Sequence, residues 1–320
     1  MEAERTLLDI LVAASALTLA SAMPFLYSAL GEVFSQLSGI FNLGVEGIML
    51  MGAFSAIYVA SDMGLNMGLP AGVLAGMLVG AVFGLIMAFV SVTMHADQGI
   101  GGIGITLVGR GLSTTLFVLL ADGILLVESF QPVVIPVLGD LPLIGEILFR
   151  QNVMVYGALL LVPVTAWLLR HTTWGLQIRA VGQNPAAADS MGVNVERVRY
   201  SAVVLGGIMA GLAGASMPLA LTNVFQVNMT SGLGFIAVAM VYFGGWSPWR
   251  VMLGSLLFSA AYNLQIWVQV LDIKLFGETV PVNFLLMMPY ILAILVLIFA
   301  RDMQRYRPRA MNKPFRRGEG

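Results

Sequence analysis

The sequence contains no cysteine, only two lysines and two histidines, and few charged side chains of either sign. Without cysteine there is no disulfide, no thiolate metal site and no cysteine nucleophile. Charged residues make up 10% of the chain, whereas an average soluble domain has about 25%. The net charge of −1 provides no field that would attract nucleic acid. These shortages exclude a soluble enzyme, a secreted disulfide scaffold, a disordered protein and a nucleic-acid partner.

The chain also lacks the motifs that bind nucleotides or metals. Neither lysine follows a glycine, so no Gly-Lys-Ser/Thr loop is present, and if ATP drives this protein another chain binds it. His95 and His171 lie far apart, without metal-binding spacing. The glycines of Gly99–Gly104 lie between two apolar runs rather than in a βαβ unit, which excludes a dinucleotide site. We therefore expect no cofactor and no metal on this chain.

Long apolar runs dominate the sequence. Hydrophobic residues make up 58% of it, and the mean hydropathy is +0.90. Because about 20 apolar residues cross a bilayer as a helix, residues 1–320 are predicted to form one all-α, polytopic transmembrane helix bundle. Nine spans are expected, or ten if Glu32–Asn42 crosses as a broken helix. The nine runs are Leu7–Leu30, Val45–Ser61, Leu69–Met94, Ile103–Ala121, Val153–Leu169, Ser201–Leu221, Leu233–Trp246, Val251–Val270 and Asn283–Ala300.

The basic residues predict the orientation, since cytoplasmic loops carry an excess of Lys and Arg. The tail, residues 301–320, and the longest internal loop, residues 171–200, are therefore expected to be cytoplasmic. The segment Asp122–Gln151 is then an external loop, and the N-terminus is outside with nine spans or inside with ten. The basic residues expected inside are Arg170, Arg179, Arg197, Arg199, Arg250, Arg301, Arg305, Arg307, Arg309, Lys313, Arg316 and Arg317; those expected outside are Arg5, Arg150 and Lys274.

Two patterns concern how the spans pack. Spans one to four resemble spans six to nine in length and order, and the odd fifth span would invert the second copy, as in many transporters. Phe41–Phe54 and Gly232–Gly245 would then be counterparts, although unrelated glycine-rich helices can look alike. Spans three and six also carry small residues at every fourth position, which favours close helix packing over a direct role. These small residues are Gly72, Gly76, Gly80 and Gly84 in span three, and Gly207, Gly211 and Ala215 in span six.

Ionisable groups at membrane depth are costly and usually functional. The candidates are Asp9, Glu32, Glu46, Asp97 and Arg110, the last expected near a membrane face. On a helix, Asn42 and Glu46 would share a face, because they lie four residues apart. Glu46 either lines a transport path or belongs to a structural network, paired with Arg110 or with backbone amides. The candidate residues for a substrate path are Phe41, Asn42, Glu46, Gln98, Asn223 and Asn263.

The internal loop contains a short capped helix. Asn184 is a good N-cap and Pro185 suits the first helical position, while Gly192 supplies the stop. A helix of about two turns is not stable alone in water, so it must dock on its own bundle or, as we favour, on a partner. The residues expected to couple to that partner are Arg179, Asn184, Pro185, Ala186, Ala187, Ala188 and Gly192.

Two motifs carry a family resemblance that covers roughly residues 7–300. They are Asn42-x-Gly44-x-Glu46-Gly47-x-Met49-x-x-x-Ala53 and Gly175-x-x-x-Arg179-Ala180-x-Gly182-x-Asn184-Pro185-x-Ala187-Ala188-x-x-x-Gly192. The chain resembles the membrane permeases of ABC importers in the branched-chain amino acid and simple-sugar family, and most of all the permeases for simple sugars and nucleosides. The second motif is similar to the importer coupling motif Glu-Ala-Ala-x-x-x-Gly, with Ala186 in place of the glutamate.

The resemblance implies a permease subunit in the plasma (inner) membrane of a prokaryote that catalyses no covalent chemistry itself. An ATP-binding subunit would dock at Asn184–Gly192 and bind the ATP. A second, related permease would complete a heterodimer, and an extracytoplasmic substrate-binding protein would deliver nucleosides or simple sugars. The alternative is a secondary transporter driven by an ion gradient, with Glu46 as the coupling carboxylate, or Asp9 or Asp97 in its place.

Overall fold

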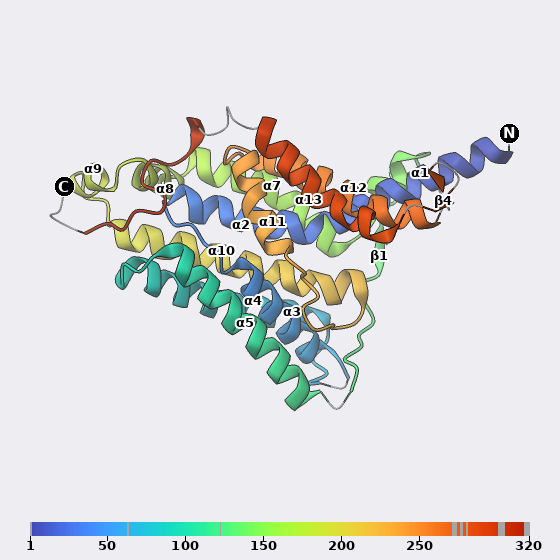
Figure 1. Cartoon of the computed structure of the whole chain (residues 1–320), viewed down its shortest axis with the longest axis horizontal. Coiled ribbons are helices and arrows are strands. Elements are labelled where there is room, and N and C mark those ends of the chain that lie inside the picture. Colours follow the sequence, from blue (N-terminus) through green and yellow to red (C-terminus); the bar gives the residue numbers. More distant parts are fainter. Residues whose placement is uncertain are drawn as a thin grey trace.

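A computed structural model describes residues 2–62, 64–121, 123–270, 274–275, 278–279, 281–299 and 305–316. Over this part of the chain the protein is a bundle of helices with four very short strands (Figure 1). Asp122, Arg301 and Arg317, and the side chains of Arg5 and Lys274, lie outside the described residues. The helices are α1 (Glu2–Ser21), α2 (Met23–Leu37), α3 (Val45–Ala60), α4 (Leu69–Ala88), α5 (Gln98–Leu120), α6 (Ile144–Leu148), α7 (Val153–His171), α8 (Thr173–Gln183), α9 (Pro185–Ser190), α10 (Val195–Met217), α11 (Leu233–Phe243), α12 (Pro248–Val270) and α13 (Val282–Phe299), with π-helical turns η1 (Phe89–Thr93) and η2 (Pro218–Thr222).

Each of the nine predicted spans corresponds to a helix or helix pair in the described residues. Six helical segments are long and apolar enough to cross a bilayer, and three shorter apolar helices make up the remainder. The short ones are Val45–Ala60, Leu233–Phe243 and Met287–Val296. The prediction of an all-α, multi-pass membrane bundle is therefore confirmed.

The first span differs from its predicted limits. It runs through α1 and α2 as one apolar segment, Asp9–Leu37, rather than ending at Leu30. Glu32–Leu37 is the last part of α2 and residues 38–44 form a loop, so Glu32–Asn42 is not a crossing of its own and the ten-span alternative is wrong. In keeping with nine crossings, the chain ends lie at opposite ends of the bundle (Figure 1). We call the end that carries α9 and the described C-terminal residues the α9 end.

Helix α10 is the centre of the bundle, where it packs against α2, α3 and α4. A Cβ on Gly211 would overlap the carbonyl oxygen of Gly76 on α4, and one on Gly214 would overlap the carbonyl of Met49 on α3. On a third face, Gly206 approaches Gly31 and Ser35 of α2. Bare backbone at these positions lets three helices contact α10 at once. The glycine rows therefore serve packing, as predicted.

The helix contacts follow the pattern that an inverted repeat predicts. Helices α2 and α10 lie side by side; α3 and α4 pack against α10, and α11 and α12 pack against α2. In the same way, α3 contacts α5 while α11 contacts α13. Figure 1 shows α4 and α5 on one side of this central pair and α12 and α13 on the other.

The end opposite α9 is covered by the segment predicted as an external loop. Strand β1 (Pro132–Val134) pairs antiparallel with β2 (Arg150–Asn152), and α6 lies between them in sequence. The Val127 N–H donates to the carbonyl of Asn223, which ties this segment to the chain that follows α10. A second short pair, β3 (Lys274–Leu275) and β4 (Glu278–Thr279), lies between α12 and α13 in sequence.

The glycine contacts of α10 lead to a stability prediction. Gly211→Ala forces a methyl group into the backbone of α4, so we expect the free energy of unfolding to fall by about 1–3 kcal/mol. The matched control is Gly111→Ala on α5, where a Cβ would have nothing within 4 Å and alanine favours the helix. Thermal unfolding of the detergent-purified variants compares them. Equal melting temperatures would contradict the close-packing account.

Candidate functional site

A buried loop at residues 38–44 joins α2 to α3 and carries the first of the predicted path residues. Asn42 is fully buried, and its Oδ1 accepts the Gly44 N–H at 2.9 Å. Gln98, the first residue of α5, accepts the Phe41 N–H at 2.7 Å through Oε1. Thr106 on the same helix donates to the Leu43 carbonyl at 2.9 Å. The structure therefore brings Phe41, Asn42 and Gln98 together, as predicted.

Glu46 lies one turn further along, in the first turn of α3, and is 4% exposed. Its Oε1 accepts from the Thr230 hydroxyl at 2.5 Å and from the Gly232 N–H at 2.8 Å. Its Oε2 accepts the Gly234 N–H at 2.7 Å. These donors form the start of α11, where free N–H groups and the helix dipole favour an anion. Of the two interpretations of Glu46, the structure supports a network built on backbone amides.

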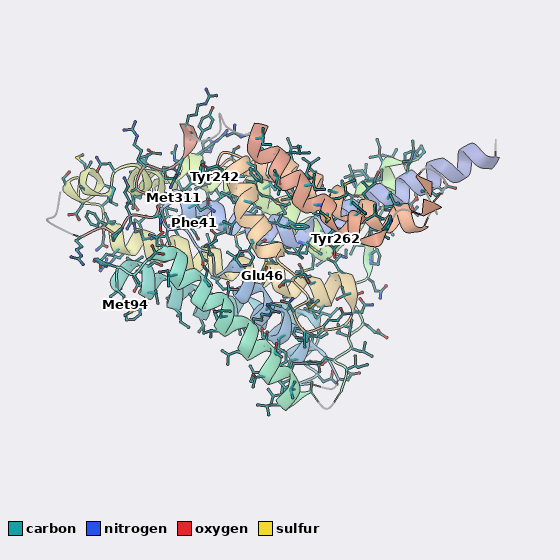
Figure 2. The ribbon with its side chains drawn as sticks, in the orientation of Figure 1. Phe41, Glu46, Met94, Tyr242, Tyr262 and Met311 are labelled. Carbon is teal, nitrogen blue, oxygen red and sulfur yellow. The ribbon has the colours of Figure 1, made fainter. Side chains whose placement is uncertain are left out.

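The N-termini of α3 and α11 meet at this carboxylate. A Cβ on Gly234 would lie 2.7 Å from the Glu46 Cα, so only glycine permits the contact. Gly232 has φ +91°, a conformation that side-chain-bearing residues rarely adopt. Figure 2 shows Glu46 near the middle of the bundle and Phe41 nearer the α9 end. Two helix starts are thus joined inside the protein rather than at its surface.

Arg110 is not the partner of Glu46. It is exposed on α5, twelve residues after the helix begins and hence roughly 18 Å along its axis. It lies near the middle of α5 rather than at either end of the helix. Asp97, another predicted buried charge, is an exposed N-cap of α5, where its Oδ1 accepts the Ile100 N–H at 2.9 Å. Asp9 is exposed on α1.

The last turns of α2 carry polar residues that the path prediction left out. Glu32, Ser35 and Gln36 are fully buried. The Gln36 amide donates to Glu32 Oε2 at 3.4 Å and accepts from the Trp246 indole at 3.0 Å, and Asn42 lies beside the Glu32 carboxyl. Oε1 of Glu32, Oγ of Ser35 and Nδ2 of Asn42 have no hydrogen-bond partner among the described residues. The signal in the sequence was the pair of polar residues four apart, Glu32 and Gln36, which the prediction placed after the first span or in a broken-helix crossing.

The two other predicted path residues lie elsewhere. Asn223 is exposed at the end opposite α9, where it lines an open cavity of about 560 Å³ together with Asp62 and Glu128. Asn263 is buried on α12, with Ser259 and Ser21 of α1 as its hydrogen-bond partners. The six candidates therefore do not form one site, and Asn263 has a structural role between two helices.

At the α9 end, the predicted short helix forms with the predicted caps. The Asn184 Oδ1 accepts the Ala187 N–H at 3.1 Å. Gly192 has φ +84°; its N–H bonds the Asp189 carbonyl at 2.9 Å and the next N–H bonds the Ala188 carbonyl at 3.0 Å. These two bonds make a Schellman stop. Asn194 then caps α10 by accepting the Arg197 N–H at 2.9 Å.

The side chains of α9 face two ways. Ala186 and Ala187 are exposed, and Met191, directly after the helix, is 83% exposed. Ala188 is buried and packs in the core. A small, largely uncharged surface with one exposed methionine suits contact with another protein. Ala188 instead anchors α9 to its own bundle.

Helix α8 lies within residues 171–200, which were predicted to form an internal loop. Thr172 caps it by accepting the Gly175 N–H at 3.0 Å. Ile178 and Val181 are buried, and Trp174 is half-buried, so an apolar spacing of four and three residues was present in the sequence. Arg179 is exposed on this helix, beside α9 in sequence. Arg199, one of the basic residues counted for the cytoplasmic side, is 1% exposed.

Among the described residues no group of three or more histidine, aspartate or glutamate side chains is placed to hold a metal ion. The polar groups of the site are thus amides, hydroxyls, backbone groups and two carboxyls. Such groups bind neutral, hydroxyl-bearing molecules through hydrogen bonds.

Comparison with known proteins gives one family. A family model described as branched-chain amino acid transport system / permease component matches residues 15–300. The chain is 38% identical to TsgC13 of Haloferax volcanii, named as a glucose ABC transporter permease, over 81% of this chain and 78% of that one. It is 37% identical to the guanosine ABC transporter permease NupQ of Bacillus subtilis (88% and 89% covered) and 36% identical to the nucleoside ABC transporter permease NupC of Lactococcus lactis (86% and 87%). No solved structure matches.

The contacts of Glu46 generate a prediction that separates a structural from an ion-coupling carboxylate. Glu46→Ala leaves the Gly232 and Gly234 N–H groups and the Thr230 hydroxyl without their acceptor, so we expect the free energy of unfolding to fall by about 3 kcal/mol. The control, Glu128→Ala, removes an exposed carboxylate and is expected to unfold like the wild type. Thermal unfolding in detergent measures both. A Glu46→Ala protein as stable as the control would refute the structural role.

Proposed function

Because the chain belongs to the branched-chain amino acid transport system permease family, we propose that α9 couples it to an ATP-binding subunit and that it imports a nucleoside or a simple sugar. The chain is a multi-pass membrane permease subunit of an ABC importer, and not itself an enzyme. Such a permease works with an ATP-binding subunit and a substrate-binding protein. Coupling through α9, the cargo and the second permease are our proposals.

The observation that carries the coupling role is the exposed, capped helix α9. It is too short to persist alone, yet it has defined caps at both ends and faces outward with Ala186, Ala187 and Met191. The same helix contacts α8 and α10. Movement of α9 by a partner would therefore act directly on α10, which packs against α2, α3 and α4. The partner subunit would bind the ATP, and the α9 end would face the cytoplasm of a prokaryotic cell, across the plasma membrane.

The cargo proposal rests on two kinds of support. Close relatives are named as permeases for guanosine, nucleosides and glucose. In this chain, the polar groups near the loop at residues 38–44 are chiefly amides and hydroxyls, including Gln36, Asn42 and Gln98. Neutral, hydroxyl-rich molecules match such donors and acceptors better than an amino acid, whose carboxylate needs a cationic or backbone N–H site.

A second, related permease would cover the open face of α5. Arg110 is exposed about halfway along this span, where contact with hydrocarbon would cost roughly 2.5–3.5 kcal/mol. A facing subunit would give the guanidinium a polar partner. A heterodimer follows from the resemblance to importers with two related permeases.

The ion-gradient alternative finds no support at Glu46. Both of its oxygens accept hydrogen bonds from α11 and Thr230. A carboxylate that must take up and release a proton or sodium ion during each cycle needs free coordination positions and a route to water. Glu46 is buried, and three hydrogen bonds hold its two oxygens in place.

The coupling proposal predicts the effect of a single exposed residue. We expect Ala187→Glu to abolish ATP-dependent uptake by the reconstituted transporter, because a longer charged side chain would separate α9 from the ATP-binding subunit. Ala187 is exposed, so the protein should fold and reach the membrane normally. Ala188 is unsuitable for this test, because it is buried and its replacement would disturb the bundle.

The control for this variant is Thr173→Glu, another exposed position at the start of α8, where an acidic residue suits the helix N-terminus. It should transport like the wild type. Normal uptake by Ala187→Glu would rule out docking through α9.

A further inference from the structure

The described C-terminal residues fold back onto the α9 end of the bundle. We call residues 308–316 the C-terminal strap. The Ala310 N–H donates to the Gly182 carbonyl at 2.9 Å, and the Asn312 N–H donates to the Gly39 carbonyl at 3.1 Å. Ala310 and Met311 are buried. The strap therefore bridges the end of α8 and the loop that follows α2.

A buried arginine fixes the strap in place. Arg199, near the start of α10, donates from Nε to the Ser38 carbonyl and from Nη1 to the Lys313 carbonyl, each at 3.3 Å. Burying a guanidinium is costly unless acceptors offset the lost hydration. The loop and the strap each supply one carbonyl to Arg199, while its Nη2 has no partner among the described residues. At Gly39, a Cβ would lie 3.1 Å from the Ala310 carbonyl oxygen and φ is +92°, so glycine is needed there.

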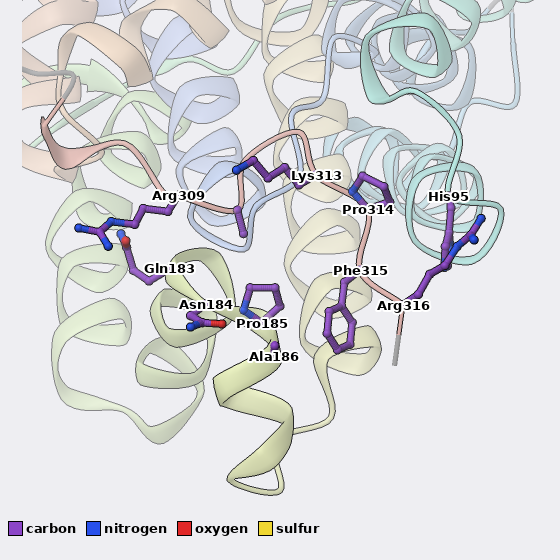
Figure 3. Close-up of a pocket in the computed structure, with 11 residues that line it drawn as sticks. His95, Gln183, Asn184, Pro185, Ala186, Arg309, Lys313, Pro314, Phe315 and Arg316 are labelled. Carbon is purple, nitrogen blue, oxygen red and sulfur yellow. The ribbon is translucent and has the colours of Figure 1, made fainter. Parts of the chain in front are cut away.

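The strap forms one wall of a pocket whose other wall begins α9. The pocket has a volume of about 440 Å³, and Gln183, Asn184 and Ala186 line it opposite Arg309 and Lys313. Figure 3 shows Arg309 beside Gln183 at one end and Arg316 beside His95 at the other. No acidic side chain lines the pocket. Arg309 and Lys313 are exposed, so their charges are available to a partner.

We propose that the strap is the second half of the docking surface for the ATP-binding subunit, and that acidic side chains of that subunit enter the pocket between Arg309 and Lys313. The inference rests on the proposed docking at α9, and it adds a charged contact that α9 does not provide. Ala186 lies on both surfaces, since it is exposed on α9 and lines the pocket. A partner that covers α9 therefore reaches the basic side chains of the strap.

The two halves of the proposed docking surface, α9 and the C-terminal strap, contribute different kinds of contact. Ala186, Ala187 and Met191 offer an apolar contact, whereas the strap offers cations. Charged pairs at the edge of an interface steer association and fix its register. Because Arg199 ties the strap to α10 and to the loop before α3, a force on the strap would act on the helices that hold Glu46.

The test is charge reversal at both basic side chains, Arg309→Glu with Lys313→Glu. The permease complex is placed in nanodiscs of neutral phosphatidylcholine and titrated with the purified ATP-binding subunit of the same transporter. We expect the dissociation constant to rise at least tenfold and its dependence on salt to weaken. The Lys313 carbonyl still holds Arg199 in this variant, so thermal unfolding should match the wild type.

Two further variants make the result specific. Arg307→Glu changes an exposed basic residue just before the strap that does not line the pocket, and it should bind the ATP-binding subunit normally. Arg309→Lys with Lys313→Arg keeps both charges and should also bind normally. If the reversed variant is unstable, Arg309→Gln with Lys313→Gln gives the same comparison with a smaller change.

Three results would overturn the inference. They are an unchanged dissociation constant for the reversed variant, an equal loss in Arg307→Glu, and a loss that appears only in nanodiscs with anionic lipid. The last would assign the pocket to lipid headgroups. Failure of the wild-type chain to bind any ATP-binding subunit would instead remove the proposed function itself, so the two failures are distinguishable.

Discussion

The carboxylate of Glu46 is the interaction on which the arrangement of this bundle depends. Helices α3 and α11 both begin inside the protein, where water cannot satisfy their first N–H groups. Glu46 accepts from the Gly232 and Gly234 N–H groups of α11 while belonging to the first turn of α3. Leaving such buried donors unpaired would cost about 1–3 kcal/mol each. Glu46 thus satisfies the start of α11, while at the start of α3 the Gly44 N–H bonds the side chain of Asn42.

Close glycine contacts lead from this carboxylate toward α9, the helix proposed to dock the ATP-binding subunit. Gly109 of α5 approaches the backbone of Gly47, directly after Glu46, and Gly214 of α10 approaches Met49. Helix α10 then runs without a break from this core to its cap at Asn194, beside α9. Backbone-to-backbone packing along α10 leaves little room for side chains to yield. If α9 docks the ATP-binding subunit as proposed, α10 would connect that surface rigidly to the interior.

The sequence predicted most of what depends on local patterns. Apolar runs located the spans, and the caps at Asn184, Gly192 and Asn194 predicted α9 and the start of α10 before any contact was known. Helix α8 was missed because its polar outer face made it look like a loop. The extension of α2 to Leu37 was missed because Glu32, Ser35 and Gln36 look like the end of a span, whereas Gln36 pairs with Trp246 in the interior.

Contacts between distant segments could not be predicted in the same way. Thr230 is 184 residues from Glu46, and no local pattern distinguishes it from other threonines near helix ends. Asn263 and Asn42 are both asparagines next to apolar residues, yet one joins two helices and the other holds a buried loop. Among the described basic residues that were counted for orientation, most are exposed, Arg250 is half-buried and Arg199 is buried. Family resemblance added the function, which no single buried polar group reveals.

The most direct test of the central claim is to measure whether uptake is driven by ATP or by an ion gradient. Vesicles containing this chain with an ATP-binding subunit and the proposed second permease, supplied with the substrate-binding protein, would be given labelled guanosine, ribose or valine. Uptake of guanosine or ribose that requires ATP and persists after an uncoupler collapses the ion gradients is the predicted result. Uptake by this chain alone that stops with the uncoupler, or uptake of valine only, would contradict the account.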